Sequence, residues 1–132
     1  MSAVKIKSAL EVALNAMTAL STNWENTAFI PVAGTAYQQV NILLAEPENI
    51  EYGRTHRELG YMQIKLMYPL QVGSVTAITR AELIRSTFYR GASFTASGVT
   101  VIIERTPEIG AGSVEGDRWA IPVKIRFFAN IL

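Results

Sequence analysis

The stretch from Leu59 to Gly91 changes its hydrophobic period from two to 3.6, and this change constrains the fold more than any other feature. Apolar and polar side chains alternate from Tyr61 to Tyr68, as in a strand with one buried face. Pro69 then removes a backbone donor, and apolar residues recur at helical spacing until Gly91. These helical positions are Ala77, Ile78, Ala81, Ile84 and Phe88. We therefore predict a strand followed by a helix over about 75–90.

The same criteria predict one more helix and three more strands. Apolar residues at helical spacing indicate a helix over about 5–20, and alternation indicates strands over 37–44 and 119–127. Another alternating run spans 94–105 and is entered through Ser97-Gly98. The side chains expected to point inward from these strands are Val40, Ile42, Leu44, Val99, Val101, Ile103, Trp119, Ile121, Val123, Ile125 and Phe127.

The order of these elements predicts an α+β domain, with a mainly antiparallel sheet and two helices packed on one face. The chain has 132 residues, so we expect a single domain over 1–132. Pro122 interrupts the donors of the last strand, which indicates an edge position or a bulge. Three glycines and a proline in 106–117 predict a long mobile hairpin loop. Residues 49–58 show no clean period and are expected to form a solvated connection.

Composition excludes several classes of function. The net charge is +1, with 12 basic and 11 acidic residues, so no long-range field attracts nucleic acid or an anionic membrane. The chain has no cysteine, which excludes a disulfide framework and thiolate chemistry. No run approaches the roughly 18 apolar residues of a membrane span. Lysines precede an apolar stretch at the start, as in a signal peptide, but Glu11 and Asn15 interrupt that stretch, so an amphipathic helix is expected.

No motif for catalysis, a cofactor or a metal is recognisable. His56 is the single histidine, and the carboxylates do not follow the spacing of a calcium loop. No serine lies in a G-x-S-x-G turn, so His56 is expected to be an exposed loop residue. The glycines of Gly110-Ala111-Gly112-Ser113 lack the lysine of a phosphate-binding loop. We therefore predict that the protein is not an enzyme and has no cofactor or metal.

The second face of the predicted sheet is basic and unusually apolar. Lys65, Lys124 and Arg126 would lie there with aromatic residues, as on a surface that binds single-stranded nucleic acid. A solvated outer face is the plainer interpretation. The face also carries several apolar residues, which favours self-association. These apolar residues are Tyr61, Met67, Ile102, Pro122 and Phe128.

The order of residues along most of the chain resembles a known family, although 49–58 and 106–118 match nothing in it. The pattern is carried by Trp24, Asn26-Thr27, Phe29-Ile30-Pro31, Tyr37 through Leu44, Ala45-Glu46-Pro47, Gly60-Tyr61-Met62-Gln63-Ile64, Ala77, Ala81, Ile84, Phe88, Arg90-Gly91, Trp119, Pro122, Ile125, Phe127 and Ala129. In this order the residues resemble the tail terminator proteins of long-tailed bacteriophages. These are lambda-like minor tail proteins that cap the tail tube.

The resemblance implies a structural protein of the virion, located at the head-proximal end of the tail and made in the bacterial cytoplasm. Its implied partners are further copies of itself in a hexameric ring, the tail-tube protein and a head-completion or connector protein. DNA would only pass through the ring, and no membrane is involved. The ring would stop tube polymerisation and offer a surface for head attachment. Edge strands near 119–127 or 37–44 would supply the contacts between copies.

Partner or oligomer contacts are expected on the glycine-rich loop and the basic face. The residues are Glu108, Ile109, Gly110, Gly112, Val114, Glu115, Asp117, Lys65, Lys124 and Arg126. Two alternatives stay open: a head-tail connector or neck protein of similar size, and a small single-strand nucleic-acid-binding module.

Overall fold

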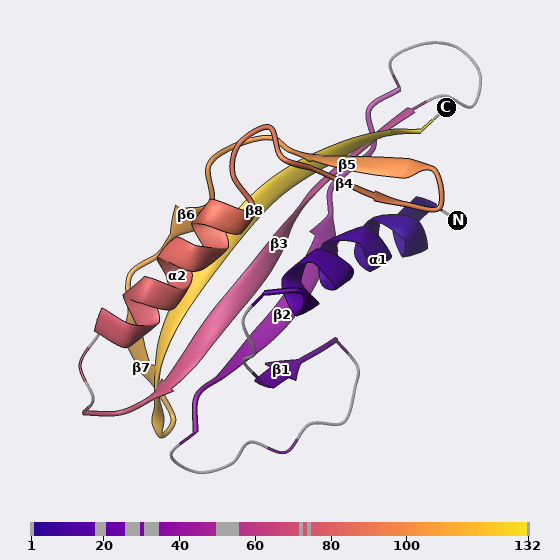
Figure 1. The fold of residues 1–132 in the computed structure, drawn as a ribbon. Coiled ribbons are helices and arrows are strands. Elements are labelled where there is room, and N and C mark those ends of the chain that lie inside the picture. The colour runs from indigo at the N-terminus through magenta and orange to yellow at the C-terminus, as the bar shows by residue number, and fades with distance from the viewer. Residues whose placement is uncertain are drawn as a thin grey trace.

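The structure is a computed structural model, and it describes residues 2–17, 21–25, 30, 35–49, 56–71, 73 and 75–131. It consists of a curled sheet with both helices on one face (Figure 1). The helices are α1 (Ser2–Asn15) and α2 (Val75–Thr87). The strands are β1 (Ser21–Asn23), β2 (Tyr37–Leu44), β3 (His56–Pro69), β4 (Ser93–Ala96), β5 (Val99–Ile103), β6 (Glu108–Ile109), β7 (Ser113–Glu115) and β8 (Arg118–Ile131).

The long strands β3 and β8 form the centre of the sheet. They pair antiparallel over their whole lengths, from His56 opposite Ile131 to Pro69 opposite Arg118. The order of the sheet is β1-β2-β3-β8-β5-β4, and β6 and β7 also pair with β8. Among the strands that the structure describes, only β1 and β2 pair in parallel. The predicted α+β class is confirmed, with a sheet that is mixed through this single pair.

The core lies between the sheet and the helices because apolar side chains alternate along β3 and β8. Met62, Ile64 and Leu66 are opposite Ile125, Val123 and Ile121, and all six are buried. α1 packs against β4 and β5, and α2 packs against β3 and β8. The core positions predicted for the second helix are confirmed, since each is fully buried: Ala77, Ala81 and Ile84 in α2, and Phe88 directly after it.

The segment predicted as a mobile hairpin loop is instead paired to the sheet, so that prediction is wrong. β6 and β7 both lie along the edge of β8, and Gly110 N–H donates to the carbonyl of Pro122 between them. Because a residue points its N–H and C=O to the same side of a strand, the donor that Pro122 lacks would face this break between β6 and β7. The sequence pattern cannot reveal that β6 and β7 pair on either side of Pro122, because strands of two and three residues show no alternation.

Three other predictions differ from the structure. The run 94–105 is a hairpin of β4 and β5, with Ser97 and Gly98 at φ of 50° and 84° in a two-residue turn. His56 belongs to β3 and is half-buried, with Nε2 3.0 Å from the Glu58 carboxylate, so it is not an exposed loop residue. The segment 119–127 is not an edge, because β8 has neighbours on both sides.

Some predictions fall on parts of the chain that the structure does not describe. These are the end of the first predicted helix at 18–20, residues 26–29 and 31 of the family pattern, and 50–55 of the expected connection. Residues 49 and 56–58 of that connection are described, and the last three belong to β3.

A buried polar chain fastens α2 to the edge of the sheet. Arg80 of α2 donates from Nη2 to Gln38 Oε1 at 3.3 Å, and Gln38 Nε2 donates to Thr22 Oγ1 at 3.0 Å. Burial lowers the pKa of Arg80, and the neighbouring Tyr68 partly offsets this. Burial likewise raises the pKa of Tyr68. These hydrogen bonds between Arg80, Gln38 and Thr22 therefore hold α2, β2 and β1 together.

Gly60 permits the close approach of β2 to β3. A Cβ atom at this position would lie 2.2 Å from the Leu43 carbonyl oxygen and 3.1 Å from Leu44 Cα, both backbone atoms of β2. Because backbone on a paired strand cannot step aside alone, we expect Gly60→Ala to lower the free energy of unfolding by about 2 kcal/mol or more. Urea denaturation measures this change.

Gln63→Ala, on the same strand and half-buried on the face away from the helices, is the matched control. It should change the free energy of unfolding by less than about 0.5 kcal/mol. Equal stability of Gly60→Ala and the wild type would contradict the close approach.

Candidate functional site: the outer face of the sheet

The face of β2, β3 and β8 turned away from the helices, called here the outer face, carries the three basic residues that the sequence predicted for it, Lys65, Lys124 and Arg126. Residues on β3 and β8 that alternate with the core positions point to this face. No described helix or strand covers it (Figure 1). Its central residues are Gln39, Asn41, Tyr61, Gln63, Lys65, Pro122, Lys124 and Arg126.

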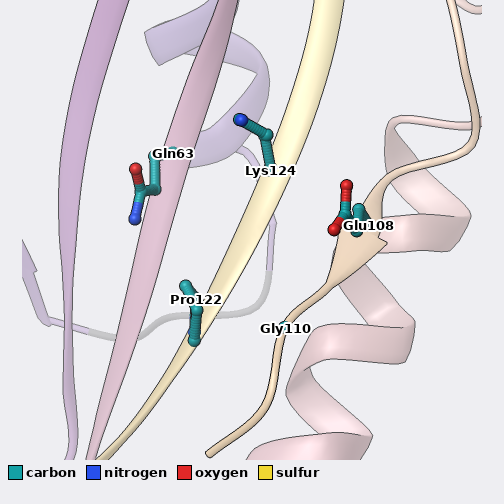
Figure 2. Close-up of a pocket in the computed structure, with 5 residues that line it drawn as sticks. All are labelled: Gln63, Glu108, Gly110, Pro122 and Lys124. Atoms are coloured by element: carbon teal, nitrogen blue, oxygen red, sulfur yellow. The ribbon is translucent and has the colours of Figure 1, made fainter.

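A pocket of about 180 Å³ lies where β3, β8 and β6 meet on the outer face. Figure 2 shows Gln63 on β3, Pro122 and Lys124 on β8, and Glu108 beside them on β6, with the helices behind the sheet. Glu108 is opposite Lys124 in the β6–β8 pairing. Polar and apolar groups line the pocket about equally, and none of its lining residues is a histidine.

The basic residues of the outer face have partners within the chain. Lys65 Nζ is 3.1 Å from the Glu115 carboxylate, so β7 is tied across β8 to β3. Lys124 Nζ lies 4.3 Å from the centre of the Tyr61 ring. Arg126 is exposed. A nucleic-acid surface needs cations and aromatic rings that are free for a ligand, and here two of the three cations already contact a side chain.

The structure separates the other predicted contact residues from this pocket. Ile109 packs against the core, and Gly112 lies against Trp119. Val114 is opposite Trp119 on the face of the helices and is 64% exposed. Asp117 stands in the β7–β8 turn with an 85% exposed side chain. Val114 and Asp117 therefore belong to the end of the molecule where β3 ends and α2 begins.

That end carries further exposed apolar side chains that the sequence analysis did not single out. Leu70, Val75 and Ile78 are 37%, 76% and 43% exposed. A cavity of about 320 Å³ lies beside them, lined by Pro69, Leu70, Gln71, Gly73 and Trp119. We call Leu70, Val75, Ile78 and Val114 the apolar end. Single exposed apolar residues are ordinary, whereas several at one end of a molecule are a candidate surface for a partner.

Sequence reasoning also missed the contact of Arg118 with Tyr37. The guanidinium lies 5.0 Å from the centre of the Tyr37 ring and donates to the carbonyl of Thr35, although Arg118 itself is buried. This contact fixes the start of β2 against the start of β8. The pair lies 81 positions apart in the chain, and no local pattern links the two residues.

Other kinds of site find no support in the part of the chain that is described. Within those ranges, no three histidine, aspartate or glutamate side chains lie close enough to hold a metal ion. None of the helices described here is long and apolar enough to cross a membrane.

Comparison with protein families decides the class of protein. A family model described as phage tail terminator protein matches residues 5–127, which is nearly the whole chain. The chain belongs to the phage tail terminator family. This family is structural rather than catalytic, and it places the protein in the tail of a phage virion.

Structural comparison agrees with the fold of this terminator-family chain. A solved structure matches it with a TM-score of 0.80 at 23% sequence identity, covering 100% of this chain and 98% of the other. At that identity the match shows a shared fold and nothing more. No curated protein matches the sequence.

Gly112 leaves room for Trp119, and this contact can be tested directly. A Cβ atom on Gly112 would lie 2.3 Å from the indole Cζ2, and Nε1 of the indole is buried. We expect Gly112→Ala to displace the ring into solvent, because an overpacked side chain must shift. Tryptophan fluorescence should move to longer wavelength while circular dichroism stays near that of the wild type.

Ser113→Ala, at the neighbouring exposed position, should leave the emission unchanged. Since the chain contains a second tryptophan, Trp24, the spectra are recorded in a Trp24→Phe background. An unchanged emission maximum in Gly112→Ala would show that the indole does not pack against Gly112.

Proposed function

We propose that this protein ends growth of the phage tail by capping the tail tube as a hexameric ring, and that the ring provides the surface for head attachment. The observation that carries the proposal is the family match over residues 5–127. The ring would contact the tail-tube protein on one side and a head-completion or connector protein on the other. DNA would pass through it without being held.

The charge of the chain supports a passage more than a DNA-binding surface. Each phosphate that a protein neutralises adds about one unit to the salt dependence of binding. The net charge is only +1. On the outer face, Lys65 and Lys124 already contact Glu115 and Tyr61. A conduit with these properties would let DNA slide through.

The apolar end is proposed as the surface that meets the tail tube. Val114 and Asp117 were predicted as contact residues from the glycine-rich segment, and they lie at this end. β7 is paired to β8 and tied to β3 by the ion pair of Glu115 with Lys65, so this surface is held rigidly. A rigid surface loses little conformational entropy when a partner binds.

Polymerisation of purified tube subunits tests the function. Added wild-type protein should shorten the tubes seen by electron microscopy, because each capped tube stops growing. Val114→Asp should leave tubes longer, since a charge at the centre of an apolar contact must be desolvated. Tube length is the measurement, with circular dichroism to show that the variant is folded.

Val12→Asp is the matched control, because Val12 on α1 is 66% exposed against 64% for Val114 and lies away from the apolar end. It should cap as the wild type does. Tubes that grow equally long with and without the wild-type protein would refute capping. A protein that ignores tube subunits and joins a purified portal instead would be a neck protein.

A further inference from the structure

β2 has an open edge over its second half. β1 pairs only with Tyr37–Gln39, so within the described chain the rest of β2 has a neighbour on one side alone. Ala45 N–H donates to the carbonyl of Leu59 on β3 at 2.8 Å. In an antiparallel ladder, alternate residues turn N–H and C=O to the same side. The N–H and C=O groups of Ile42 and Leu44 therefore point away from β3, toward the open edge.

The side chains at this edge also lack a neighbour. Leu43 is 46% exposed and Leu44 is 43% exposed, although the sequence pattern predicted that Leu44 points inward. Consecutive strand residues lie on opposite faces, so the two leucines are exposed on both sides of the sheet. One added strand would cover both, whereas a partner on a single face would cover only one. An edge of this kind is a template for strand addition.

β4 offers the second open edge. The two-residue turn Ser97-Gly98 makes Ala96 and Val99 the hydrogen-bonded pair that closes the hairpin. Alternation then turns the N–H and C=O groups of Ser93 and Thr95 away from β5. Both side chains are exposed, and no strand of the described chain pairs with that edge.

We propose that β2 of one copy pairs antiparallel with β4 of the next copy, with Leu44 opposite Ser93 and Ile42 opposite Thr95. The inference deepens the proposed function and rests on the ring. The two edges are different surfaces of the same chain, so the contact is heterologous and repeats from copy to copy. Rotation between copies then closes the series into a ring.

Charges beside the two edges support a second copy as the occupant. Glu46 and Glu48 follow β2, are exposed, and make no ion pair in the described structure. Arg90 precedes β4 and is also exposed. It lines a shallow depression of about 560 Å³ together with Glu104, Arg105 and Thr106. The edge of β2 therefore ends in two carboxylates, and the edge of β4 begins beside two guanidinium groups, Arg90 and Arg105, with the single carboxylate of Glu104 in the same depression.

The charges also select the orientation. Antiparallel pairing places the residues that follow β2 beside those that precede β4, so Glu46 would face Arg90. Parallel pairing would instead place Glu46 beside the uncharged turn Ser97-Gly98. Complementary charges across an interface fix its register and exclude wrong partners.

Cysteine pairs test the contact in a chain that has no cysteine of its own. Leu44→Cys and Ser93→Cys proteins are mixed and oxidised, once free in solution at about 1 mM and once bound to tail tubes. We expect a disulfide-linked heterodimer, because facing residues on paired strands lie about 5.5 Å apart at Cα. Each variant alone should stay uncrosslinked. Asp117→Cys mixed with Leu44→Cys is the control. Asp117 is exposed in the turn before β8 and belongs to neither of the two edges that are proposed to pair.

Three outcomes would overturn the proposal. Dimers of Leu44→Cys alone would show two-fold pairing of β2 with itself. A disulfide of Leu44→Cys with Thr95→Cys in place of Ser93→Cys would show a different register. The absence of any heterodimer, both free and on tubes, would show that these edges do not meet.

Charge exchange gives an independent readout. Glu46→Arg and Arg90→Glu should each weaken self-association about tenfold or more in analytical ultracentrifugation, and the double variant should recover most of the loss. Equal weakening in the double variant would contradict the pairing. Failure of the pairing is distinguishable from failure of the function: a protein that shortens tubes without crosslink or charge rescue keeps its role and loses this contact.

Discussion

The antiparallel ladder between β3 and β8 is the interaction on which the rest of the structure depends. Its register runs from His56 opposite Ile131 to Pro69 opposite Arg118, and it sets which side chains face the helices. A shift of one strand by one residue in this pairing would move all of its core side chains to the outer face. The helices, the hairpin β4–β5 and the short strands β6 and β7 all dock on positions that this register fixes.

Periodicity predicted the long elements well because their faces differ strongly in polarity. β2 was predicted with its observed bounds, and the buried positions Ala77, Ala81 and Ile84 of α2 and Phe88 directly after it were predicted correctly. Periodicity failed where an element is short or its pairing is distant. β6 and β7 span two and three residues, so they carry no alternation, and their place is set by β8.

The surfaces were less predictable than the core, because a surface residue is defined by what surrounds it in space. The sequence placed Lys65 and Lys124 on one face. It could not reveal that Lys65 forms an ion pair with Glu115 or that Lys124 lies over the Tyr61 ring. Leu44 alternates like a core residue and is nevertheless exposed. The missing information is the extent of β1, which stops pairing at Gln39.

Three short strands pair with the side of β8 that faces away from β3, and Pro122 lies at the break between two of them. β7 covers the start of that side, β6 the middle and β5 the end, with the proline opposite the gap between the first two. An unbroken edge of fourteen residues would be a template for pairing with strands of other chains. A single imino acid thus separates the docking positions of β6 and β7 along one of the two fourteen-residue strands.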